Sequence, residues 1–187
     1  MAGLLCGFGM SSLASTKDAV REAVGDANRS MDGGVDCISI AFVSSTVDRD
    51  ADEVRRCFVS ALPAATPMHG LTSSAAVLTT AGARPGAVAC LLLSGATGCF
   101  ATAYSDTAEE GKGAAEAAEA LHEEMDSPQA IIMSTVPGSE EGVIAALAAR
   151  FPDVPVRCNT SLPAHVFWPS HRFMSHPNDA KANKRST

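Results

Sequence analysis

The sequence predicts a mixed α/β fold in which helices pack on a mostly buried mixed sheet. Three observations support this prediction. Hydrophobic residues make up 46% of the 187 residues and charged residues 19%, a composition that suits a domain with a sizeable core. Apolar runs of strand length alternate with segments of helical periodicity. Around residues 68–104, shorter apolar runs lie between turn residues, which indicates an antiparallel hairpin or meander inserted in the fold.

The first third of the chain predicts strand, helix, strand and helix. An apolar strand at Leu4–Phe8 is followed by Ser15 and Asp18, whose spacing is typical of a helix start. The stripe of apolar residues that follows has the spacing i, i+3, i+4, i+7, and Asp32-Gly33-Gly34 ends the helix. The nearly continuous apolar run Cys37–Val43 predicts a strand covered on both faces. The stripe consists of Val20, Ala23, Val24 and Ala27.

The second helix begins at a capping-box spacing formed by Asp50 and Glu53, and Pro63 ends it. The following short runs, separated by Gly, Pro and Ser, predict the hairpin or meander attached to the sheet. The apolar face expected for the helix comprises Val54, Cys57, Phe58, Ala61 and Leu62. The expected short runs are 68–72, 75–79, 87–93 and 99–104.

The last part of the domain predicts two more helices, each followed by a strand. Asp106 or Thr107 caps the third helix, and Gly138 and Ser139 open the fourth. Strands are expected at Gln129–Val136 and Val154–Cys158. The residues expected to face inward are Ala114, Ala118, Leu121 and Met125 from the third helix, and Val143, Ile144, Leu147 and Phe151 from the fourth.

Beyond Pro163 the periodicity fades, so we expect one domain over residues 1–168 and a basic, disordered tail over 169–187. The tail has four Lys or Arg and one Asp, a net charge of +3. Because the net charge of the whole chain is −7, residues 1–168 have a net charge of −10. Such an acidic body disfavours nucleic acid and anionic ligands. No apolar run approaches the ~20 residues that a membrane span needs. The six cysteines form no CxxC pair, which favours a reducing, cytoplasmic location.

Most catalytic signatures are missing, and we expect no catalytic residues, no metal and no cofactor. The segment from Met68 to Ser74 is the strongest candidate for ligand binding. Its glycine permits close backbone approach and its hydroxyls both donate and accept hydrogen bonds. We therefore predict Gly70, Thr72 and Ser73 as ligand-binding residues. A weaker alternative is a hydrolase that uses Cys158 with His165, or a serine of the 72–74 turn.

An ordered set of segments over residues 5–160 resembles the N-terminal domain of the FIST family. The resemblance includes the apolar strand that ends in Phe and Ser, and the apolar–Gly–Thr–Ser turn. After Pro155 the chain departs from the family pattern, because Arg157–Thr160 replaces a Gly-rich turn, and we expect the domain to be truncated there. The similar segments are Gly7–Ser12, Ala19, Glu22-Ala23, Ile38–Ser45, Met68–Ser73, Gly111–Glu124, Ala130–Ser134, Glu140-Glu141 and Val154–Val156.

The resemblance implies a non-enzymatic domain that senses a small, amino-acid-like ligand in signal transduction. It also implies that a protein partner or an output domain, supplied in trans, receives the signal. The alternative is a structural or protein-interaction subunit that keeps the sensory fold without a ligand.

Overall fold

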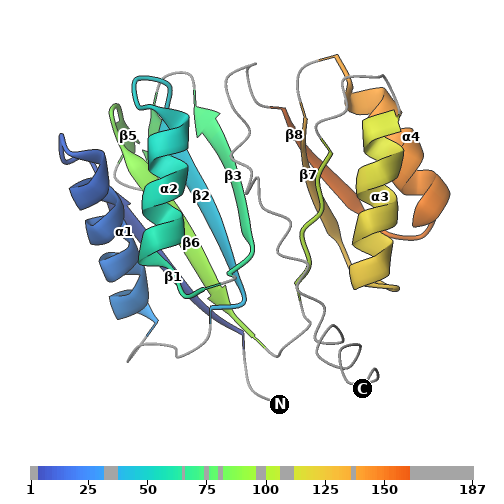
Figure 1. Cartoon of the computed structure of the whole chain (residues 1–187), viewed down its shortest axis with the longest axis horizontal. Helices are drawn as coiled ribbons and strands as arrows, with labels where there is room; N and C mark the ends of the chain where they lie inside the picture. The colour runs from blue at the N-terminus through green and yellow to red at the C-terminus, as the bar shows by residue number, and fades with distance from the viewer. Residues whose placement is uncertain are drawn as a thin grey trace, which may run out of the picture.

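The computed structural model describes residues 4–31, 38–64, 66–73, 76–79, 82–95, 100–105, 112–135 and 138–160. Within them the fold is mixed α/β, as the sequence predicts. One group of elements consists of a four-stranded sheet with α1 and α2 on one face, and another contains β7, β8, α3 and α4 (Figure 1). In chain order the elements are β1 (Leu5–Ser11), α1 (Thr16–Ser30), β2 (Ile40–Thr46), α2 (Ala51–Ala61), β3 (Met68–Ser73), β4 (Val77–Thr79), β5 (Gly82–Arg84), β6 (Val88–Ser94), α3 (Lys112–Glu124), β7 (Ile131–Thr135), α4 (Glu140–Arg150) and β8 (Val156–Thr160).

The main sheet has the strand order β1-β6-β2-β3. Strand β6 is antiparallel to both of its neighbours, whereas β2 and β3 are parallel. It follows that β1, β2 and β3 all run in one direction and that their carboxyl ends lie at the same edge of the sheet. Because α1 follows β1 and α2 follows β2, both helices begin at this edge (Figure 1).

The caps of α1 and α2 form as the sequence predicts. Ser15 Oγ accepts a hydrogen bond from the Asp18 amide at 3.3 Å, and Asp50 Oδ1 accepts one from the Glu53 amide at 2.6 Å. The predicted apolar stripe of α1 is entirely buried. On α2 the prediction for Ala61 is wrong, because Val54, Phe58 and Leu62 repeat every four residues and take the sheet-facing positions, which leaves Ala61 exposed.

Helix α1 lies directly against β1 because two glycines of the strand present no side chain to it. A Cβ on Gly9 would lie 1.8 Å from the carbonyl oxygen of Ala23, and one on Gly7 would lie 2.0 Å from that of Ala27. The helix in turn presents small alanines at these positions. The sequence Gly7-Phe8-Gly9 is therefore a condition for the packing of α1 on the sheet.

The antiparallel hairpin expected around residues 68–104 exists as β4 and β5. Its flanking strands do not continue it as a meander: β3 pairs with β2, and β6 inserts between β1 and β2. Turn residues indicate where the chain reverses direction, but burial decides which strand lies at the centre of a sheet. The apolar run of β6 is buried at most of its positions, as a central strand is. Residues 100–105 form no strand.

The elements of the second group surround a smaller core. Ile131 and Met133 of β7 pack with Ala118, Leu147 and Phe151 from the helices. Ile132 points to the opposite face of β7 and is exposed. The prediction for Ile144 is wrong, since Val143, Leu147 and Phe151 repeat every four residues and take the inward positions, which leaves Ile144 exposed.

Some predictions lie outside the described residues: the helix stop at 32–34, the third helix cap at 106–107, and the tail over 169–187. The side chains of the proposed pair Cys158 and His165 are also outside the described part of the chain. In the described part of the chain, no helix is long and apolar enough to cross a membrane.

Candidate functional site

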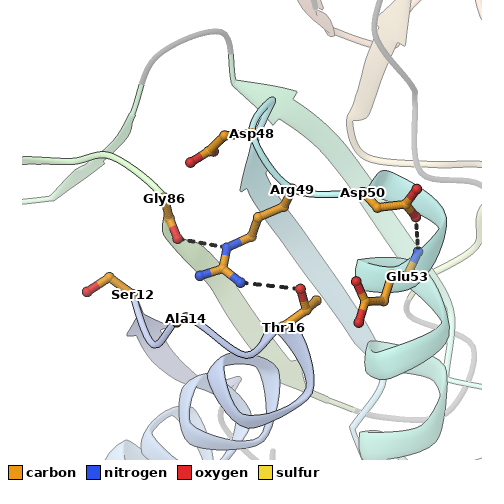
Figure 2. Close-up of a pocket in the computed structure, with 8 residues that line it drawn as sticks. All are labelled: Ser12, Ala14, Thr16, Asp48, Arg49, Asp50, Glu53 and Gly86. Atoms are coloured by element: carbon orange, nitrogen blue, oxygen red, sulfur yellow. Dashed lines mark hydrogen bonds between the residues drawn. The ribbon is translucent and has the colours of Figure 1, made fainter.

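A cavity of about 330 Å³ lies at the sheet edge where β1 and β2 end and α1 and α2 begin (Figure 2). This volume is at the small end of the range for ligand pockets. In open α/β sheets, ligands generally bind outside the carboxyl ends of the strands. The lining residues come from the loop after β1, the loop after β2, the first turns of both helices, and the turn before β6. They are Ser12, Ala14, Thr16, Asp48, Arg49, Asp50, Glu53 and Gly86.

Arg49 joins three segments that surround the cavity. Its Nε donates to the carbonyl oxygen of Gly86 at 2.7 Å, and Nη2 donates to that of Leu13 at 2.6 Å. Its Nη1 lies 3.4 Å from Thr16 Oγ1. Figure 2 shows the guanidinium between the turn at Gly86 and the beginning of α1. The loops after β1 and β2 and the turn before β6 are therefore connected through one side chain.

The charged lining of the cavity is mainly acidic. Asp48, Asp50 and Glu53 contribute three carboxylates against the single guanidinium of Arg49. A concave surface lined by one sign of charge concentrates counter-ions, so this lining favours a ligand with a positively charged group. Among the described residues, no three acidic, His or Cys side chains converge as metal ligands do. The ammonium group of an organic cation or zwitterion is a positive charge that carboxylates bind through hydrogen bonds.

The structure places the predicted residues Gly70, Thr72 and Ser73 in β3, next to β2. Gly70 and Thr72 are buried, and the Ser73 hydroxyl donates to the carbonyl oxygen of Ala76 at 2.7 Å. Ser73 shares the carboxyl edge of the sheet with the cavity, because the amide of Val47 donates to its carbonyl oxygen at 2.9 Å. The cavity lining does not include these three residues.

Thr72 has a buried hydroxyl neighbour on the adjacent strand. It pairs in register with Ser45, which is fully buried and whose Oγ has no hydrogen-bond partner in the structure. A buried hydroxyl without a partner is costly, and a bound water is the usual way to satisfy it.

The sequence reasoning missed Asp48 and Arg49 as site residues and used Asp50 and Glu53 only as a helix cap. The missed signal is the charged triplet Asp48-Arg49-Asp50, which follows a buried strand at its carboxyl end. Side chains at this position face the region where ligands of α/β sheets bind. The contribution of Gly86 has no comparable signal, because β6 is far away in the chain.

His69 connects the two groups of elements. It lies in β3, its ring contacts Phe42 of β2 edge-to-face with centroids 5.8 Å apart, and its Nε2 lies 2.9 Å from Ser134 Oγ of β7. Burial lowers the pKa of His69 from its ordinary value of 6.5, because a charged imidazolium loses its hydration there. His69 is therefore neutral in the folded protein at neutral pH.

We expect His69 to make the folded protein less stable in mild acid. Because its folded-state pKa is lower than its unfolded-state pKa, the unfolded chain binds the proton more readily, and stability rises with pH. The contribution is complete above an unfolded pKa of about 6.5 and is lost as the pH falls through the folded-state value. Urea unfolding of the protein and of His69→Gln, followed from about pH 8 to about pH 5, should show a smaller decline for the variant. Equal declines would contradict this role.

Two cysteines of the described chain are poor nucleophiles. Burial raises the pKa of the Cys90 thiol to about 12. Burial and the nearby charge of Glu53 raise the pKa of Cys57. Because the thiolate is the reactive form, neither thiol is activated for attack at neutral pH.

The comparisons with known proteins agree with this architecture. The family model described as FIST N domain matches residues 38–157, which is more than half of the chain. No curated protein matches the chain. The matched region contains the loop with Asp48, Arg49 and Asp50 and the turn with Gly86, while β1 and α1 precede it. The chain belongs to the FIST N family, a family of sensing domains of signal-transduction proteins.

Proposed function

We propose that this chain is a non-enzymatic sensing domain that binds a small amino-acid-like molecule in the cavity at the carboxyl ends of β1 and β2. The observation that carries the proposal is the position and charge of this cavity, which is lined by Asp48, Asp50 and Glu53. The acidic lining favours ligands whose net charge is positive or zero, so basic and neutral amino acids bind better than acidic ones, whose second carboxylate it repels. We further propose an intracellular location, which the free thiols of Cys6, Cys57 and Cys90 support.

The number of charged groups in the cavity supports recognition of the ligand through its ammonium. Each of the three carboxylates of the lining is an acceptor that an ammonium can reach singly, and charge-assisted hydrogen bonds are stronger than neutral ones. The first turn of α2, which begins at the N-cap Asp50, already contains Asp52 and Glu53 next to the helix N-terminus. These acids complement the helix dipole and oppose an incoming anion.

Thermal denaturation in the presence of each of the twenty L-amino acids tests the proposal. A ligand at 100 times its dissociation constant adds about 2.7 kcal/mol to the stability of the folded state. For a domain of this size we expect the melting temperature to rise by roughly 5–10 °C with L-lysine or another basic amino acid. L-Aspartate and L-glutamate should give the smallest shifts. The absence of a shift with every amino acid would contradict the proposed function.

Two variants distinguish the cavity from the residues that the sequence singled out. Asp48→Asn removes one carboxylate of the cavity, and Ser73→Ala removes a hydroxyl from the predicted Gly70–Ser73 site. We propose that Gly70, Thr72 and Ser73 support the same sheet edge, so Asp48→Asn should weaken the response to L-lysine more than Ser73→Ala. Asp153→Asn, which removes an exposed charge beyond α4, is the matched control.

A second candidate function is that of a protein-interaction subunit, and apolar side chains exposed on the face of the main sheet opposite α1 and α2 favour it. On the face opposite α1 and α2, Phe8 pairs in register with Leu91, and Leu91 pairs with Phe42. Phe8 is 48% exposed and Leu91 is 36% exposed. Exposed apolar surface of this kind is often an interaction site. This candidate would be preferred if no amino acid stabilised the protein.

A further inference from the structure

We propose that Arg49 is a positioning residue that holds the walls of the cavity together, and that it does not receive the carboxylate of a ligand. The first half of the proposal stands on the contacts of Arg49 alone. The second half rests on the proposed function, because it concerns which part of an amino acid the cavity recognises.

The hydrogen bonds of Arg49 reach segments that are far apart in the chain. Each of its three guanidinium nitrogens has a protein oxygen within reach: Gly86 O at 2.7 Å, Leu13 O at 2.6 Å and Thr16 Oγ1 at 3.4 Å. These acceptors belong to the loop after β1, the start of α1 and the turn before β6. The rigid, planar fork of donors in arginine suits such a bridge, whereas lysine offers a single nitrogen.

The two short bonds occupy Nε and Nη2, the pair of nitrogens through which an arginine grips a carboxylate from the side. Both use carbonyl oxygens, which accept hydrogen bonds strongly, and Nε and Nη2 donate to them. A bidentate grip on a ligand carboxylate uses two parallel N–H groups of one guanidinium. A ligand that took these donors would leave the carbonyl oxygens of Leu13 and Gly86 without their partner. The carboxylates of Asp48, Asp50 and Glu53 are then the charged groups of the lining that remain for a ligand.

Hydrogen–deuterium exchange without any ligand tests the bridge. In Arg49→Gln, amides in residues 12–16 and 82–87 should exchange roughly tenfold faster or more, because bonds that hold these segments in place are lost. Amides in the middle of β2 and β6 should keep their rates, which would show that the main sheet remains folded. Arg49→Lys should give intermediate rates, since it keeps the charge but reaches fewer acceptors. Arg56→Gln removes an exposed charge from α2, the helix that follows Arg49, and should change nothing.

Unchanged exchange in both segments of Arg49→Gln would overturn the bridge, whether or not the protein binds an amino acid. The proposal therefore stays testable if the proposed function fails. Failure of the proposed function would be seen as the absence of a thermal shift in the unmodified protein.

Titration with L-lysine and with L-lysinamide, which lacks the carboxylate, tests the role toward the ligand. If Arg49 only positions the loops, Arg49→Gln should weaken binding of both probes by the same factor. If Arg49 received the carboxylate, the variant would weaken binding of L-lysine and leave binding of L-lysinamide unchanged, which would overturn the proposal. A general loosening of the loops weakens the binding of both probes equally, so the ratio of their dissociation constants does not change.

Discussion

We expect Gly9→Ala to destabilise the protein strongly, although it adds only one methyl group. The new Cβ would lie 1.8 Å from the carbonyl oxygen of Ala23, so the backbone of α1 must move away from β1. This displacement disturbs the packing of Val20, Val24 and their neighbours in the main core. Overpacking of a well-packed site costs typically 1–3 kcal/mol, and a clash with backbone belongs at or above the upper end. Urea unfolding should show a loss of about 3 kcal/mol or more.

A matched control is Gly25→Ala, which adds the same methyl group to α1 itself. The new Cβ would meet only the flexible end of Arg29, at 3.5 Å. Because alanine favours a helix more than glycine does, this variant should gain up to about 1 kcal/mol. A similar stability of the two variants would contradict the close packing of α1 on β1.

We expect Phe58→Ala to be the most destabilising truncation in α2. Phe58 is completely buried and belongs to the core cluster that joins α1, α2 and the main sheet. Removal of a buried phenylalanine side chain costs about 3–5 kcal/mol, because apolar contacts are lost and a cavity remains. For a domain of this size the melting temperature should fall by roughly 10 °C or more.

Phe8→Ala is the control for Phe58→Ala. Phe8 lies on the face of the sheet opposite α1 and α2, where its side chain is 48% exposed. Since truncation there removes fewer contacts and leaves no closed cavity, it should cost about 1.5 kcal/mol or less. Equal losses for Phe8→Ala and Phe58→Ala would contradict this difference and show that Phe8 is packed as closely as Phe58.

Sequence reasoning predicted the helices well because their signals are local. Ser15 with Asp18 and Asp50 with Glu53 form caps within one helical turn, and the apolar stripe of α1 needs only a helical period. Faces were predicted less well at Ala61, the last residue of α2, and at Ile144, near the middle of α4, which were expected inside and are exposed. In both helices the apolar residues that face inward are spaced four apart, so Leu62 takes the inward position in place of Ala61, and Val143 in place of Ile144.

The pairing of strands could not be predicted in the same way. The apolar run of β6 predicts a strand, but its place between β1 and β2 depends on contacts with residues about 40 to 90 positions away in the chain. The candidate site depends on the same long-range pairing. Arg49 and Gly86 meet only because β6 enters the sheet next to β2.

The sequence alone determined the fold class, the caps of α1 and α2, the acidic charge and the resemblance to the FIST N family, because these follow from composition and from residues close in the chain. Only the tertiary structure decided that Asp48, Arg49 and Gly86 share one cavity at the carboxyl edge of the sheet. The physical reason is that strand order sets which loops become neighbours, and strand order is fixed by burial across the whole sheet rather than by any local pattern.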